Sequence, residues 1–106
     1  MKKSYNKLIR DKTLETIKNN NEEPIYRVLE DVEFKKELLQ KLNNECKDVL
    51  YAETDEELFD ALAEFLEVVF ALADINDRRD DLLKIMKNKR AERGSYKGKI
   101  FLEGIK

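Results

Sequence analysis

Apolar residues recur at helical spacing along most of this chain. One such face, between residues 32 and 52, is formed by Leu38, Leu39, Leu42, Cys46, Val49 and Leu50. A second, between residues 54 and 74, is formed by Leu58, Leu62, Phe65, Leu66 and Val69, and a third, between residues 78 and 93, by Leu82, Leu83, Ile85 and Met86. No Gly or Pro lies between residues 25 and 93, so the pattern predicts long helices over these three stretches.

Local signals predict where the helices begin and end. Asp31 is the expected N-cap of the helix over 32–52, because its carboxylate is able to accept from backbone N–H groups of the first turn. Thr54 is expected to cap the next helix, with Glu57 at the third helical position. Gly94 is the expected stop of the helix over 78–93, and a short helix is predicted over 13–18.

These elements predict an all-α fold, a bundle of about four helices in a single domain covering residues 1–106. Short strands are expected near 25–29 and 98–102, where apolar residues alternate or cluster outside the helices. A chain of 106 residues buries a modest core, so we expect helices of different copies to complete one another in a dimer or tetramer.

Composition narrows the functional classes. Charged residues make up 42% of the chain, yet the net charge is −2, which argues against a binder of nucleic-acid polymers. No apolar run approaches the roughly 20 residues of a membrane span, and we expect a soluble, cytoplasmic protein. The chain has no His and one cysteine, Cys46, which is expected to be a small core side chain. Any catalytic or metal-binding chemistry is therefore expected to use carboxylate, Lys or hydroxyl side chains.

Carboxylates occur in two pairs at helical spacing inside the most apolar part of the chain. Glu45 and Asp48 form one pair, and Glu64 and Glu67 form the other. Residues three apart project from one side of a helix, so two packed helices are able to aim four carboxylates at one point. Oxygen ligands of this kind suit Mg²⁺, which commonly completes its shell with a substrate phosphate.

A plainer interpretation is that the acids form a solvated face, paired with nearby Lys and Arg. We prefer it for Glu56, Glu57 and Asp60, because such surface pairs are common and weak. Glu45 and Glu64 differ, since a core-facing carboxylate needs a cation, a hydrogen-bond partner or a proton. For Glu45 and Glu64, a bound metal ion is the simpler hypothesis.

Several motifs in order resemble those of the all-α nucleoside triphosphate pyrophosphohydrolases, the MazG and phosphoribosyl-ATP pyrophosphohydrolase superfamily. The chain begins like a small subgroup with a Tyr-x-Lys-Leu-Val-Arg-Asp-Lys signature, here Tyr5-Asn6-Lys7-Leu8-Ile9-Arg10-Asp11-Lys12. The similarity continues over 26–29, 41–48 and 61–69, and ends at 89–96. It covers nearly the whole chain.

The resemblance implies a set of site residues. The superfamily's metal motif is Glu-Glu-x-x-Glu followed by Glu-x-x-Asp, and it falls on Asn44-Glu45-x-x-Asp48 and Ala61-x-x-Glu64. Glu45, Asp48 and Glu64 keep carboxylates at usual magnesium-ligand positions, whereas Ala61 replaces the fourth acid. Glu67 or Asp60 would then supply the carboxylate that is missing at Ala61. The subgroup signature makes Lys7, Arg10 and Lys12 the candidate residues for binding substrate phosphates.

The resemblance therefore implies a house-cleaning, Mg²⁺-dependent hydrolase, with Mn²⁺ as a substitute. It would convert a nucleoside triphosphate to the monophosphate and pyrophosphate, with Glu45, Asp48 and Glu64 as catalytic residues. Two other hypotheses stay open, the first of them because Ala61 removes a usual ligand. One is a catalytically degenerate member that binds a nucleotide or a protein, and the other is a purely structural helical oligomer.

Overall fold

The computed structural model describes residues 6–106, and these form four helices and no strand. In chain order they are α1 (Asp11–Asn19), α2 (Asp31–Leu50), α3 (Asp55–Asp74) and α4 (Arg79–Arg93). The predicted all-α class and the number of helices are confirmed. Tyr5, the first residue of the subgroup signature, lies outside the described residues. None of the helices within 6–106 combines the length and apolarity that a membrane span requires.

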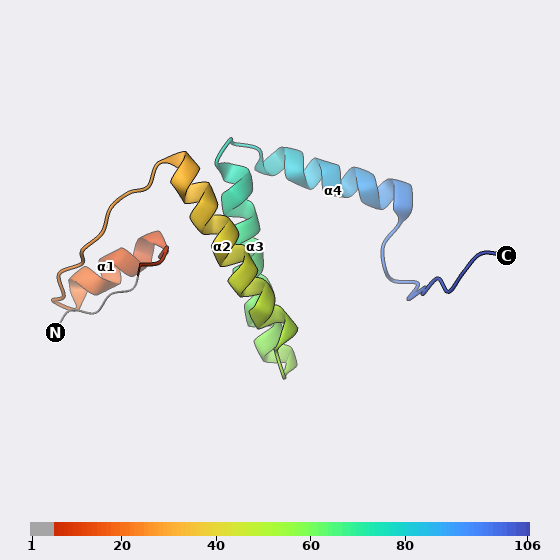
Figure 1. The fold of residues 1–106 in the computed structure, drawn as a ribbon, viewed down its shortest axis with the longest axis horizontal. Helices are drawn as coiled ribbons and strands as arrows, with labels where there is room; N and C mark the ends of the chain where they lie inside the picture. Colours follow the sequence, from red (N-terminus) through yellow and green to blue (C-terminus); the bar gives the residue numbers. More distant parts are fainter. Residues whose placement is uncertain (1–5) are drawn as a thin grey trace.

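Helices α2 and α3 form a hairpin at the centre of the molecule (Figure 1). Thr54 caps α3 as predicted, with its Oγ1 accepting from the backbone N–H of Glu57 at 3.1 Å. The Glu57 carboxylate in turn accepts from the backbone N–H of Glu53 at 3.0 Å. These two bonds satisfy N–H groups at the tight connection, so the helices turn back on each other within a few residues.

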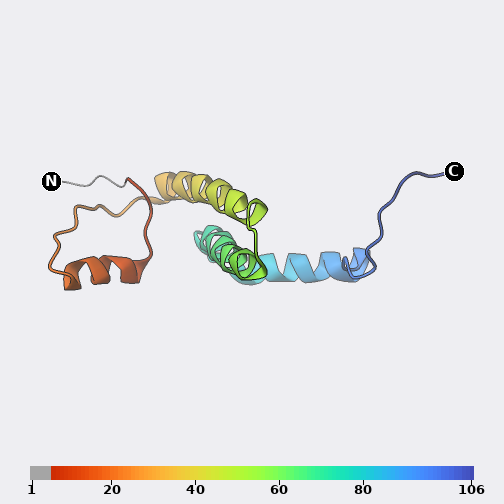
Figure 2. The ribbon, with the colours of Figure 1, turned by 90° about the horizontal axis from the view of Figure 1, so that it is seen from below.

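The core lies between these two helices. Its buried residues, among those described, are Leu38 of α2 and Ala61 and Val68 of α3. The other two helices extend to opposite sides of the hairpin (Figure 2). Within the described chain α1 packs on no other helix, and α4 contacts only α3.

The corner between α3 and α4 is held by ionic contacts. Arg79 donates to Asp74 through Nε at 3.0 Å and through Nη2 at 2.6 Å. Its guanidinium also lies 4.6 Å from the centre of the Phe70 ring. Arg78 pairs with Asp81 at 3.0 Å, and Asp77 adopts a left-handed backbone conformation with φ 54°. Together these contacts direct α4 away from the hairpin.

The predicted strands near 25–29 and 98–102 are wrong, since both segments are irregular. They lie on opposite sides of the hairpin (Figure 1), so neither is able to satisfy the other's backbone hydrogen bonds. Two smaller expectations also fail. Asp31 is the first residue of α2, after Glu30 as an N-cap without a side-chain bond. Cys46 is exposed rather than in the core.

The molecule is more open than a compact protein of the same length. Its accessible surface is 10478 Å², whereas a compact folded chain of 12.6 kDa exposes about 6,200 Å². Its radius of gyration is 18.5 Å, against about 13 Å for a compact domain of this length. Many large apolar side chains consequently lie at the surface.

Candidate functional site

A groove of about 530 Å³ lies where the N-terminal segment meets the hairpin. Apolar side chains of the two hairpin helices, among them Leu38 and Val68, form part of its wall. Its charged lining residues are evenly balanced between three cations and three anions. They are Lys7, Arg10, Lys41, Asp11, Glu64 and Glu67.

Three parts of the chain bring these charges together. Lys7, Arg10 and Asp11 come from the segment leading into α1, where Arg10 is the N-cap residue in an extended conformation. Lys41 projects from α2. Glu64 and Glu67 project from one side of α3, as their spacing predicts.

Arg10 and Glu64 form the ion pair that joins the N-terminal segment to the hairpin. Arg10 Nη2 lies 2.9 Å from Glu64 Oε2, and the two side chains are 57% and 49% exposed. A pair this exposed is worth at most about 1 kcal/mol. Arg10 is therefore free to exchange one anion for another at little cost.

Glu45 is more enclosed than Glu64. Its side chain is only 13% exposed, and Oε1 lies 3.7 Å from Nζ of Lys41, one helical turn earlier. The expectation of an inward-facing carboxylate is confirmed for Glu45 and wrong for Glu64, whose side chain is 49% exposed. The counter-charge of Glu45 in this structure is the Lys41 ammonium, which also lines the groove.

The four predicted metal ligands are not gathered at one point. Glu64 and Glu67 line the groove, but Glu45 and Asp48 do not, and Asp48 is exposed. No three acidic side chains within residues 6–106 lie close enough together to hold a metal ion. Ala61, where the resemblance led us to expect an acid, is 8% exposed and belongs to the hairpin core. Any carboxylate at that position would start out buried between the helices.

Of the predicted phosphate-binding residues, Lys7 and Arg10 line the groove, whereas Lys12 lies exposed on α1 and does not. Sequence reasoning missed Lys41, and also Asp11 and Thr13 as lining residues. Lys41 lies four residues before Glu45, so the sequence predicts its pairing with Glu45 but not its place in the groove.

The described groups whose pKa values are shifted lie outside the groove. Hydrogen bonds from Arg27 to the Glu33 carboxylate, at 3.0 and 2.5 Å, lower the pKa of Glu33 and raise that of Arg27. The hydrogen bonds to Asp74 raise the pKa of Arg79 at the α3–α4 corner. Neither pair lines the groove.

The chain matches no protein-family model, no curated protein and no solved structure.

Proposed function

We propose that this protein is a Mg²⁺-dependent nucleotide pyrophosphohydrolase of the MazG-like class, acting on nucleoside triphosphates in the cytoplasm. The observation that carries this proposal is the groove itself. It sets Lys7, Arg10 and Lys41 beside Glu64 and Glu67 on a partly apolar wall. Cations for a triphosphate and carboxylates for metal and water are the two groups of residues that the reaction needs.

The three cations are assigned to the phosphates. Arg10 is the principal one, because a guanidinium matches the geometry of phosphate oxygens and its present partner is another anion, Glu64. When a triphosphate enters, Arg10 exchanges Glu64 for a phosphate oxygen. The exchange costs about 1 kcal/mol or less, since the ion pair is exposed.

The carboxylates are assigned to the reaction centre. Once Arg10 has moved, Glu64 is available to orient a water molecule and accept its proton as that water attacks phosphorus and pyrophosphate leaves. When bound, Mg²⁺ supplies charge neutralisation of the phosphates and polarisation of the attacked group. Glu45, Asp48, Glu64 and Glu67 match Mg²⁺ in donor chemistry, but their placement in this structure is not that of a metal site.

Ala61 favours one rival, a protein of the same class that binds nucleotides without hydrolysing them. Ala61 occupies the position of a metal-ligand acid and is buried in the hairpin core. The groove cations do not depend on that acid, so nucleotide binding would survive its loss.

Pyrophosphate release from a panel of canonical and modified nucleoside triphosphates, with Mg²⁺ or Mn²⁺, tests the proposal. We expect release from at least one of them. We expect that release to fall at least about 100-fold in Glu64→Gln, because the general base is lost. Glu15→Gln on the exposed side of α1 is the matched control and should retain full activity.

Calorimetry with the same nucleotides distinguishes the enzyme from a protein that binds nucleotides without hydrolysing them. Binding without pyrophosphate release at high protein concentration identifies a binding module. Absence of both binding and release eliminates both hypotheses.

A further inference from the structure

Most of the last quarter of the chain is exposed in the single molecule. We call residues 82–106, which comprise most of α4 and the tail that follows it, the C-terminal arm. On α4, Ile85 and Met86 are 47% and 52% exposed. In the tail, Phe101 is 86% exposed and Ile105 is 91% exposed. An unpaired apolar surface of this extent marks a binding surface.

The arm is held away from its own hairpin. The bidentate contact of Arg79 with Asp74, and its stacking on Phe70, fix the direction in which α4 leaves α3. Figure 1 shows α4 and the tail extending to one side, away from the α2–α3 pair. In this arrangement, cover for the arm would come from another molecule.

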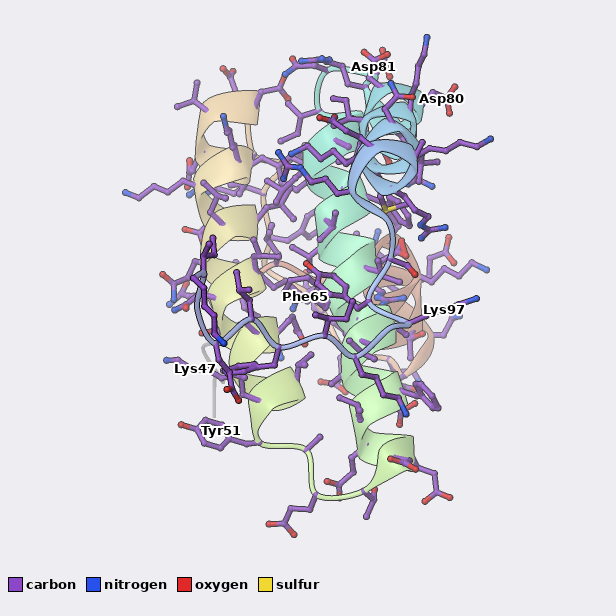
Figure 3. All side chains as sticks on the ribbon, turned by 90° about the vertical axis from the view of Figure 1, so that its right-hand side faces the viewer. Lys47, Tyr51, Phe65, Asp80, Asp81 and Lys97 are labelled. Atoms are coloured by element: carbon purple, nitrogen blue, oxygen red, sulfur yellow. The ribbon has the colours of Figure 1, made fainter. Side chains whose placement is uncertain are left out.

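Helix α3 has an exposed surface that matches the arm in apolar character. Phe59, Leu62 and Leu66 recur at helical spacing on α3 and are 69%, 36% and 51% exposed. Towards the corner, an apolar groove continues between α3 and α4, lined by residues that include Val69 and Leu82. Figure 3 views the hairpin from the side of α4, with Phe65 of α3 near its middle.

The two surfaces also match in charge. Residues 53–77, which contain α3, carry nine acidic side chains and no Lys or Arg. The arm carries eight Lys and Arg against two Glu. The chain is nearly neutral as a whole, so this segregation is hidden in its net charge of −2. Opposite fields on two exposed apolar surfaces favour their association.

We propose that the C-terminal arm of one copy docks on helix α3 of a second copy of this chain. Because both copies carry both surfaces, two such contacts related by a two-fold axis close a dimer. Docking of the arm does not require that the protein hydrolyse nucleotides.

The dimensions allow this contact. Helix α3 has 20 residues and is about 30 Å long. The 12 residues that follow Gly94 reach about 40 Å when extended, so the tail alone is able to span it. The chain exposes about 4,000 Å² more than a compact monomer of its mass, several times the roughly 800 Å² that each partner contributes to an ordinary interface.

A pair of charge-reversed variants distinguishes docking between copies from docking within one chain. The arm-reversed variant is Lys97→Glu with Lys99→Glu, and the helix-reversed variant is Glu56→Lys with Asp60→Lys. All four side chains are exposed, so circular dichroism should show the helix content of the parent. Each variant alone should dissociate at least about tenfold more readily than the parent, because like charges then meet at the interface.

Mixing the two variants gives the decisive measurement. In the mixture, the basic arm of the helix-reversed chain meets the acidic α3 of the arm-reversed chain, and the acidic arm meets the basic α3. Sedimentation velocity at low salt should therefore show heterodimers, with association restored towards that of the parent.

Lys35→Glu with Lys36→Glu, two exposed positions on α2, is the matched control and should associate like the parent. A parent protein that is monomeric at about 100 μM, where an interface of ordinary affinity is saturated, overturns the proposal. So does a mixture that associates no better than the separate variants, which is the result expected of an arm that folds onto its own α3.

Discussion

Arg10 sets the charge that the groove presents to a ligand. The lining contains three cations and three carboxylates, and Arg10 neutralises Glu64 directly. Under the proposed function, a triphosphate entering the groove would compete with Glu64 for this guanidinium. The balance of charge at this site thus depends on one exposed side chain from the N-terminal segment.

We predict that Arg10→Ala weakens binding of a non-hydrolysable nucleoside triphosphate by about 10- to 100-fold, the usual worth of a hydrogen bond to a charged group. Isothermal calorimetry measures the effect. Arg10→Lys should retain part of the affinity, because it keeps the charge but not the two-pronged geometry. Arg27→Ala, which removes an Arg outside the groove, is the control. Unchanged affinity in Arg10→Ala would remove Arg10 from the site.

Ala61 is the second residue on which the proposed chemistry depends. We predict that Ala61→Glu destabilises the metal-free protein by about 1–3 kcal/mol, because it buries a carboxylate and adds volume to the hairpin core. The same variant should gain more melting temperature from Mg²⁺ than the parent does, since ligand binding stabilises the folded state.

Ala63→Glu is the matched control for this variant, because Ala63 lies exposed on the same helix. It should show neither the loss nor the added response to Mg²⁺. If Mg²⁺ has equal effects on the melting temperatures of Ala61→Glu and the parent, position 61 does not belong to a metal site.

The Arg27–Glu33 pair makes a prediction about pH. Hydrogen bonds from Arg27 hold the pKa of Glu33 below its ordinary value of 4.5. The folded state favours the ionised carboxylate, so the pair stabilises the protein above that value, and the contribution is lost as pH falls through the folded pKa. An NMR titration should show the Glu33 midpoint moving upward in Arg27→Ala. Identical midpoints in the two proteins would contradict the pairing.

At the scale of elements, the connection between α2 and α3 depends on the cap at Thr54. We predict that Thr54→Ala lowers the free energy of unfolding by about 1 kcal/mol, because the N–H of Glu57 loses its acceptor. Thr54→Ser keeps the hydroxyl and should cost only a few tenths of that. Chemical denaturation of the three proteins measures the difference, and equal losses in both variants would assign the effect to the methyl group instead.

Helix boundaries were predictable where a single side chain or backbone angle determines them. Thr54 caps α3, and Gly94 ends α4 with φ 82° and its N–H bonded to the carbonyl of Arg90. The strands near 25–29 and 98–102 were not predictable, because a strand depends on a partner. The direction set by Arg79 and Asp74 carries the tail away from the N-terminal side.

In the candidate site, too, positions within one helix were predictable and contacts between distant segments were not. Glu64 and Glu67 share a side of α3 because of helical geometry, which the sequence contains. The contact of Arg10 with Glu64 follows instead from the path of the N-terminal segment across the hairpin. No local rule predicts such a path. For the same reason the spacing of the carboxylates within each helix did not predict that Glu45 and Asp48 would not line the groove.

At the scale of the whole molecule, the small buried core limits the stability of a single chain. Three apolar residues are buried among those described, while Phe59, Leu66 and much of the arm are exposed. A folded state that buries so little gains most of its remaining apolar burial by association. Stability should therefore be a property of the assembled copies.

We predict that the melting temperature rises with protein concentration. For a dimer that dissociates as it unfolds, a 100-fold increase in concentration adds about 2.7 kcal/mol of stability, or about 5–10 °C for two chains of this length. Circular dichroism at about 5 and 500 μM, with path lengths adjusted, measures the shift. The arm-reversed variant should melt at lower temperature than the parent at both concentrations, because its dimer is weaker. A melting temperature that is the same across this range would show that the single chain is stable with its apolar surface exposed, and that its folding does not depend on a second copy.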